Sequence, residues 1–366
     1  MIGQQITVSP MRMTKMHQNF SLYGIYDLAG GADDEHFDRT LLPFSVVEGV
    51  QIENVSALLT TDTFDCVKER IGSDAMSHLR GVEYALVHRY SPKAFLDSDG
   101  NWVGEEIQSQ SSADLVRNVA ACLRIVRPMR QSAQLMWGGV REDRRLDVLG
   151  FDAPIDHHEV PEVQKHFHLR NRDVDDLRFY APHFLRAMRE QFWKFRMAVQ
   201  FHELGHFQSL AWKARYILWA SAIESIYTSH NSGHKGSMVA KERIKWFLGA
   251  GTSIYPPGDI SKLLPDPGIT VGDIVDDLYE VRNFIAHGDK IPDHFFQDSL
   301  RKGFNGDVNA LDVLMEASSF VIRASLLKIL RERLLEHFED ATSADAYFGS
   351  ASLTWSEIKK RARGGT

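Results

Sequence analysis

Cysteine is scarce in this sequence, and its scarcity excludes a disulfide framework. The chain of 366 residues contains two cysteines, Cys66 and Cys122, which are far apart and lack the paired spacing of a metal-binding motif. Disulfides stabilise mainly secreted domains, so we expect a reducing compartment, and the cytoplasm is the expected location.

Long apolar runs are also missing. The most apolar late stretch, FVIRASLLKILRERLL, is interrupted by arginine and lysine, which argues against a membrane span. The N-terminal segment MIGQQITVSPMRMTKMHQNF has no apolar core of the kind found in secretory signal peptides. We therefore expect no signal peptide and no membrane partner.

The sequence also has no excess of positive charge. The formal net charge is −7, which argues against bulk electrostatic attraction to nucleic acid but leaves a local basic patch open. The apolar and charged fractions are those of an ordinary globular protein.

The first 155 residues predict a mixed α/β domain. Strands are expected where β-branched and aromatic residues lie near glycine or proline, in segments 21–28, 42–52, 82–90, 133–140 and 145–151. Helices are expected at 63–79 and 112–130, with Thr63 and Ser112 as N-caps. No sequence fingerprint identifies this domain, which we expect to sense a trigger or to select a substrate.

The rest of the chain predicts an all-α domain, which makes the expected fold class α+β. Residues 156–182 are polar and contain prolines, so they predict a connector. The helical domain is expected at 183–340, followed by a basic C-terminal tail at 341–366. Its predicted helices lie near 183–207, 211–229, 235–249, 271–287 and 308–338.

The string HELGH contains the H-E-x-x-H signature of zinc peptidases as His202, Glu203 and His206. Histidines four residues apart share one helix face and can reach one metal, while the glutamate activates a water. A third protein ligand is required. Ser209 and Trp212 stand where one zinc-peptidase class has glycine and histidine, whereas Glu224 stands close to the glutamate spacing of another class.

Two interpretations of this string remain open. The residues Leu185, Met188, Phe192, Phe195 and Val199 form a helical apolar stripe that His202 and His206 continue. Such a position suits a buried metal and equally suits two packed, hydrogen-bonded histidines. A second histidine-rich run, at 157–168, has no recognised ligand spacing and predicts a solvated connector.

The segment LYEVRNFIAHG, residues 278–288, carries a different signal. An apolar face runs along the predicted helix, and Arg282 lies at its edge. The residues of that face are Val271, Ile274, Val275, Leu278, Val281 and Ile285. Gly288 is a natural helix terminator, so His287 falls at the helix C-terminus, where the macrodipole stabilises a cation. Arg282 and His287 are rotated apart on an ideal helix, so they converge only if the last turn distorts or if a second copy faces the first.

With this segment the chain resembles the HEPN superfamily (higher eukaryotes and prokaryotes nucleotide-binding), particularly its Apea-like branch, over about residues 190–340. The resemblance depends on RNFIAH followed by glycine, on LWASAIESIY with Glu224 as a buried helix-packing residue, and on the helix order. Arg-x(4–6)-His alone is a weak pattern. It also matches Arg12–His17, Arg178–His183, Arg196–His202 and Arg331–His337, none of which has the flanking asparagine and terminal His-Gly.

The resemblance implies a metal-independent endoribonuclease of a toxin or anti-phage system, with a catalytic site formed by Arg282, Asn283 and His287 in a face-to-face homodimer. It implies no cofactor and no metal, RNA as the substrate, and a possible antitoxin or trigger protein as partner. The alternatives are a non-catalytic HEPN dimerisation or interaction protein and the zinc metallopeptidase. The basic residues of the tail either contact RNA backbone or are simply solvated. These residues are Lys359, Lys360, Arg361 and Arg363.

Overall fold

The computed structural model describes about three fifths of the chain. The described residues are 16–25, 38–55, 83–90, 93–96, 102–106, 109–127, 135–141, 146–151, 169–189, 192–207, 210–228, 236–255, 268–297 and 309–349.

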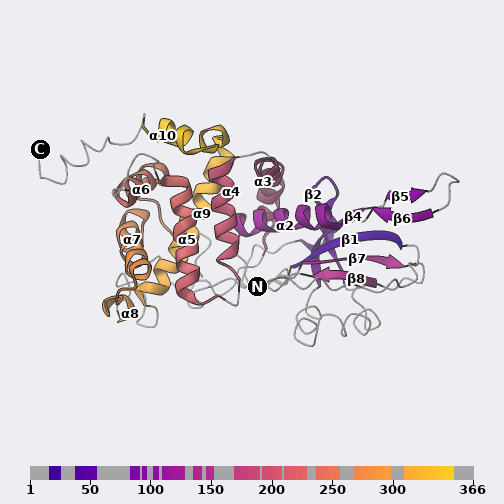
Figure 1. The fold of residues 1–366 in the computed structure, drawn as a ribbon, viewed down its shortest axis with the longest axis horizontal. Coiled ribbons are helices and arrows are strands. Elements are labelled where there is room, and N and C mark those ends of the chain that lie inside the picture. Colours follow the sequence, from indigo (N-terminus) through magenta and orange to yellow (C-terminus); the bar gives the residue numbers. More distant parts are fainter. Residues whose placement is uncertain are drawn as a thin grey trace, which may run out of the picture. The chain divides into compact units, whose positions relative to one another are not determined.

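The chain forms two compact units that alternate along the sequence (Figure 1). The first comprises Met1–Ile25, Leu42–Arg117 and Gln134–Ala153, and the second comprises Tyr26–Leu41, Asn118–Ala133 and Pro154–Thr366. The boundary falls within helix α2 (Ser109–Val126), whose second half belongs to the second unit. The coarse expectation of an α+β protein is confirmed, because the first unit holds the sheets and the second is mainly helical.

The first unit is built on an antiparallel sheet with the strand order β2-β3-β4-β1-β7-β8. Its strands are β1 (Met16–Ile25), β2 (Phe44–Val47), β3 (Val50–Asn54), β4 (Tyr84–Tyr90), β7 (Leu135–Arg141) and β8 (Leu146–Phe151). Val50 and Ile52 of β3 are buried while Gln51 between them is exposed, which is the period-2 pattern of a half-buried strand.

Most predicted strands of this unit are confirmed, with two differences. The predicted strand at 42–52 is a hairpin, because Gly49 takes φ +81° and turns the chain between β2 and β3. The sequence did not predict the small two-stranded sheet of β5 (Lys93–Leu96) and β6 (Trp102–Glu106). The helix expected at 63–79 lies outside the described residues.

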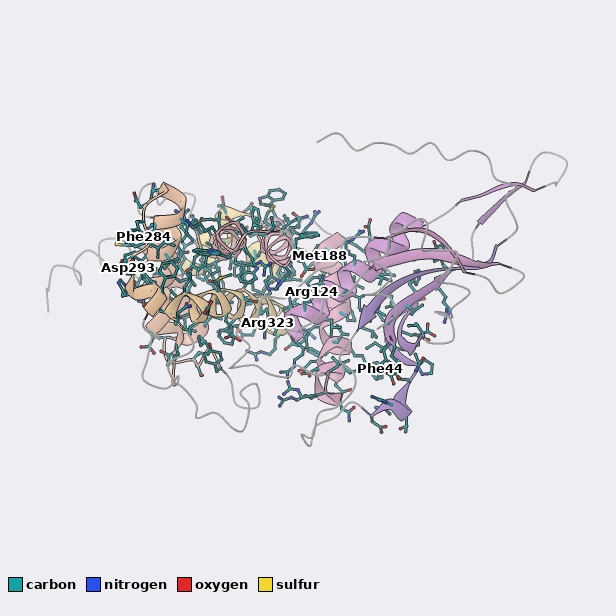
Figure 2. All side chains as sticks on the ribbon, turned by 90° about the horizontal axis from the view of Figure 1, so that it is seen from below. Phe44, Arg124, Met188, Phe284, Asp293 and Arg323 are labelled. Carbon is teal, nitrogen blue, oxygen red and sulfur yellow. The ribbon has the colours of Figure 1, made fainter. Side chains whose placement is uncertain are left out.

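The second unit packs its helices around α9, which contacts α3, α4, α5, α7 and α8. The elements are η1 (Arg39–Leu41), α3 (Asn171–Arg189), α4 (Trp193–Leu204), α5 (Trp212–Tyr227), α6 (Gly236–Ile244), a π-helical turn η3 (Lys245–Gly249), α7 (Val271–His287), α8 (His294–Gln297), α9 (Ala310–Arg331), η4 (Leu335–Phe338) and α10 (Ala341–Gly349). The second half of α2 joins this unit, and Arg323 of α9 donates a hydrogen bond to the Ile125 carbonyl of α2 at 3.2 Å. Figure 2 labels Arg323 and Arg124 close to this contact.

The expected connector at 156–182 is wrong from residue 171 onward, because α3 begins at Asn171. Its buried face follows helical spacing through Val174, Leu177, Ala181 and Phe184. The Asp173 carboxylate also accepts a hydrogen bond from the Arg170 amide at 3.0 Å and stabilises the first turn. The polar composition and Pro182, which is exposed, made this helix difficult to predict from the sequence.

Three boundaries in the second unit also differ from those expected. The single helix predicted at 183–207 is two helices, because α3 ends at Arg189 and Phe192, which precedes α4, has the non-helical backbone angles φ −80° and ψ 78°. The helix predicted to reach residue 338 ends at Arg331, where Arg333 takes φ +56°. The expected tail begins with a packed helix, since Phe348 of α10 is buried.

Candidate functional site

Helix α7 presents the predicted catalytic segment, and its bounds match the expected 271–287. At its start, the Asp273 carboxylate accepts hydrogen bonds from the Thr270 amide at 2.9 Å and the Thr270 hydroxyl at 2.6 Å. At its end, Gly288 takes the left-handed conformation with φ +74°, and the Asp289 amide donates to the Phe284 carbonyl at 2.8 Å. The helix is therefore fixed at both ends by local interactions.

Arg282 lies at the partly exposed edge of α7 and pairs with Glu224 of α5. One guanidinium nitrogen contacts the two Glu224 oxygens at 3.0 and 3.2 Å, and another donates to the Asn283 side-chain oxygen at 3.2 Å. The Arg282 and Glu224 side chains are 30% and 28% exposed, so the expectation that Glu224 is buried is wrong. Glu224 instead contacts the predicted catalytic arginine.

His287 is the last residue of α7 and is exposed, as is Asn283 one turn earlier. The helix stays α-helical to His287, so its last turn does not bring the imidazole towards Arg282. The structure describes the side chains of both Arg282 and His287, and no hydrogen bond joins these two side chains. Within one chain, the predicted trio is therefore presented along one helix end and is not assembled into a closed site.

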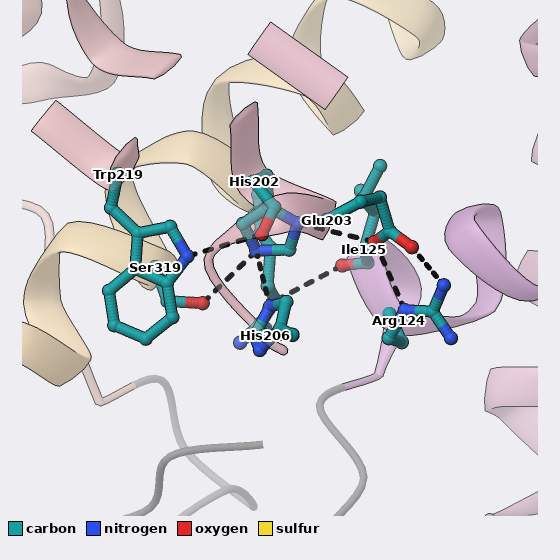
Figure 3. A network of polar contacts seen from close by, with 8 residues as sticks. Arg124, Ile125, His202, Glu203, His206, Trp219 and Ser319 are labelled. Carbon is teal, nitrogen blue, oxygen red and sulfur yellow. Dashed lines mark hydrogen bonds and ion pairs between the residues drawn. The ribbon is translucent and has the colours of Figure 1, made fainter. Parts of the chain in front are cut away.

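The two histidines of HELGH lie in a buried polar network between α4, α5, α9 and α2 (Figure 3). The Nε2 atoms of His202 and His206 lie 3.2 Å apart, and the same His202 nitrogen lies 3.2 Å from the Ser319 hydroxyl. The Trp219 indole donates to the His202 carbonyl at 3.2 Å. This arrangement is the packed, hydrogen-bonded alternative of the two interpretations that the sequence left open.

Glu203, the third residue of the motif, forms an ion pair with Arg124 of α2. Arg124 Nε donates to one carboxylate oxygen at 3.0 Å, and a terminal guanidinium nitrogen contacts the other oxygen. The Arg124 side chain is 2% exposed. A buried guanidinium needs a paired carboxylate, so Glu203 is committed to Arg124 and does not offer a free base to a metal-bound water.

The network perturbs two pKa values. Burial, the largest single contribution, raises the pKa of Glu203, but the charge and hydrogen bonds of Arg124 together with the contact to His202 lower that pKa to about 2. Burial lowers the pKa of His202, against an opposing contribution from Glu203. The ion pair is therefore charged at neutral pH, and protonation of the His202 imidazole is disfavoured.

The third-ligand requirement separates this network from a zinc-peptidase site. Glu224, the ligand suggested by the sequence, is paired with Arg282 of α7 instead. Among the residues that the structure describes, no group of three or more histidine, cysteine, aspartate or glutamate side chains is arranged to hold a metal ion. The zinc-peptidase hypothesis therefore has no support in the geometry of these residues.

The basic tail residues Lys359, Lys360, Arg361 and Arg363 and the histidine-rich run at 157–168 lie outside the described residues. Arg124 was not predicted as a site residue, because its only local signal in the sequence is a charged residue inside the apolar stretch AACLRIV.

Comparison with known proteins gives no family for this chain. No family model, no curated protein and no solved structure matches the sequence.

In the described part of the chain, no helix combines the length and apolar character needed to cross a bilayer.

Proposed function

We propose that the second unit is a metal-independent endoribonuclease of the HEPN type, acting as a homodimer in a toxin or anti-phage system. The observation that carries the proposal is the exposed end of α7, where Arg282, Asn283 and His287 reach the surface within two turns of one another. A cation beside a polar amide and an imidazole is a suitable set for binding and cleaving a phosphodiester.

The proposed reaction needs only these side chains and the substrate. The 2′-oxygen of a ribonucleotide attacks the adjacent phosphorus, and the bond to the 5′-oxygen breaks. His287 takes the 2′-hydroxyl proton, and the partner subunit's His287 protonates the leaving oxygen; each transfer is typically worth about 10²–10⁴-fold in rate. Arg282 stabilises the charge that develops on the phosphate, and Asn283 orients it.

The geometry of α7 supports a dimer under this proposal. Arg282 and His287 are rotated apart on a regular helix, so one chain supplies each group on a different side. A second copy of α7 facing the first would place the His287 of one chain near the Arg282 of the other. The first unit would then select the RNA or respond to a trigger or antitoxin protein, and the cytoplasm remains the expected location.

One observation favours the alternative of a non-catalytic HEPN interaction protein. The Arg282 guanidinium is already held by Glu224 at 3.0 Å, as expected for an arginine that only joins α5 to α7. A nuclease requires that a phosphate compete for this guanidinium, whereas an interaction protein does not.

The test is RNA cleavage by untagged protein, comparing wild type with His287→Ala, Arg282→Ala and His294→Ala. His294 is an exposed histidine on α8 outside the motif, so His294→Ala is the matched control. We expect the first two variants to lose at least 10²-fold in rate, and wild type and His294→Ala to cleave equally, in EDTA, with 2′,3′-cyclic phosphate ends. Equal cleavage by wild type and His287→Ala would indicate a contaminating ribonuclease and leave the interaction protein as the better hypothesis.

A further inference from the structure

Four tyrosines of the second unit are almost completely buried, and one of them differs from the others. Tyr216 donates to the Leu278 carbonyl at 2.9 Å, Tyr227 bonds the Ser325 hydroxyl at 2.6 Å and Tyr255 donates to Glu316 at 2.9 Å. The Tyr279 hydroxyl is buried and has no hydrogen-bond partner among the residues that the structure describes. A buried hydroxyl without a partner is unfavourable, so its retention calls for a physical explanation.

Tyr279 lies about one turn before Arg282 on α7, and its side chain is buried. Residues three apart on a helix are neighbours on its surface, and α7 packs against α5, which carries Glu224. The Lys241 ammonium of α6 lies 5.9 Å from the centroid of the Tyr279 ring. Burial is the main cause that raises the pKa of Tyr279, Glu224 raises it further and Arg282 lowers it, so both charges act on this hydroxyl.

The Arg282–Glu224 pair is itself open to exchange. Both side chains are close to one-third exposed, and pairs with this solvent access are held weakly. If Arg282 turns towards a phosphate, Glu224 loses the only cation with which it is paired in the described part of the chain. A half-buried carboxylate then needs another donor.

We infer that Tyr279 is a positioning residue whose unbonded hydroxyl donates to Glu224 when Arg282 leaves that carboxylate for a phosphate. This role rests on the proposed function for its substrate, an RNA phosphodiester. The hydroxyl that lacks a partner in the free protein thus gains one in the bound state, and the exchange lowers the penalty of separating Arg282 from Glu224. Tyr279 touches neither the phosphate nor the reacting atoms.

A double-mutant cycle without RNA tests the inference. Thermal unfolding is measured for wild type, Tyr279→Phe, Arg282→Ala and the double variant. With Arg282 present, Tyr279→Phe should leave the melting temperature unchanged or raise it, because no hydrogen bond is lost. In the Arg282→Ala background the same change should lower it by about 2–4 °C, because Glu224 then depends on the hydroxyl.

Tyr216→Phe is the matched control, since its hydroxyl is bonded in the free protein and its loss should destabilise both backgrounds equally. A spectroscopic readout separates positioning from packing. With ¹³Cζ-labelled tyrosine, the Tyr279 resonance should shift as inorganic phosphate is added, and it should already be shifted in Arg282→Ala without phosphate.

The outcomes distinguish this inference from the proposed function. Equal effects of Tyr279→Phe in both backgrounds, or a Tyr279 resonance that responds neither to phosphate nor to Arg282→Ala, overturn the role of Tyr279 even if His287-dependent cleavage is found. Coupling between Tyr279 and Arg282 without any RNA cleavage supports the exchange at Glu224 and overturns the ribonuclease alone.

Discussion

The buried network around HELGH depends on single residues, and Gly205 is one of them because its lack of a side chain leaves room for Trp219. Gly205 ends α4 with an ordinary helical φ of −64°, so backbone strain does not require glycine there. The requirement is space, because an added Cβ would overlap the indole ring of Trp219. That indole donates to the His202 carbonyl at 3.2 Å, and the glycine therefore allows α5 to approach the end of α4.

We predict that Gly205→Ala destabilises the protein by about 1–3 kcal/mol, as overpacking does in well-packed cores. Chemical denaturation followed by tryptophan fluorescence measures the effect. Gly251→Ala is the control, since no atom lies within 4 Å of its added Cβ, and it should change stability little. A Gly205→Ala variant as stable as Gly251→Ala would show that Trp219 moves aside at no cost.

The positions of the candidate site residues were predictable from the sequence, whereas the residues with which they pair were not. Arg282 and His287 were assigned their roles from a short string of sequence, and both residues lie on the helix that this string predicted. The pairs Arg282–Glu224 and Arg124–Glu203 span 58 and 79 positions. Their formation depends on how helices pack, and no local spacing encodes it.

At the scale of elements, α7 and α3 show when a helix can be read from sequence. The apolar period, the Asp273 acceptor and Gly288 of α7 are all local, so its bounds were predictable. In α3 the polar residues and Pro182 indicated a connector, and the buried face of the helix became evident only from its packing in the structure. The same limit hid the break between α3 and α4, where the apolar stripe continues through Phe192 although the helix does not.

The ion pair between α2 and α4 predicts how these elements respond to acid. The pKa of Glu203 is about 2 in the folded protein against an ordinary value of 4.5. The unfolded chain therefore binds the proton first, and the stability that the pair contributes is present above pH 4.5 and is lost as pH falls towards 2. Burial also depresses the pKa of His202, which adds a loss of stability as pH falls below its ordinary value of 6.5.

We predict that Glu203→Gln removes the acid-dependent loss between pH 4.5 and 2 and lowers stability at neutral pH by about 3–5 kcal/mol, because Arg124 keeps a buried charge without its partner. Unfolding by urea across this pH range measures both effects. Asp293→Asn, which removes an exposed pair with Lys290, should shift the profile by less than about 0.5 kcal/mol. A Glu203→Gln profile parallel to that of wild type would contradict the assignment of this slope to the pair.

At the scale of the whole molecule, the proposed function depends on self-association through α7. Asn283, Ala286 and His287 are all exposed on the last turns of this helix, and Ala286 is the small residue among them. A close approach of two such helices requires a small side chain there, and the interface would be isologous.

We predict that wild type is a dimer at micromolar concentration and that Ala286→Arg is a monomer that has lost RNA cleavage but keeps its melting temperature within about 2 °C. Sedimentation velocity and thermal unfolding give the two measurements. Glu336→Arg, an exposed change on η4, should remain dimeric. A monomeric wild type that cleaves RNA with full dependence on His287 would exclude the composite site.

The alternation of the two units along the chain limits how this protein can be divided or recombined. A fragment that begins at Pro154 would carry Glu203 on α4 but not Arg124, which comes from the segment Asn118–Ala133. It would also lack the Ile125 carbonyl to which Arg323 donates. The helical unit therefore cannot be transferred by gene fusion as one contiguous module, and any exchange that preserves it must take the second half of α2 along.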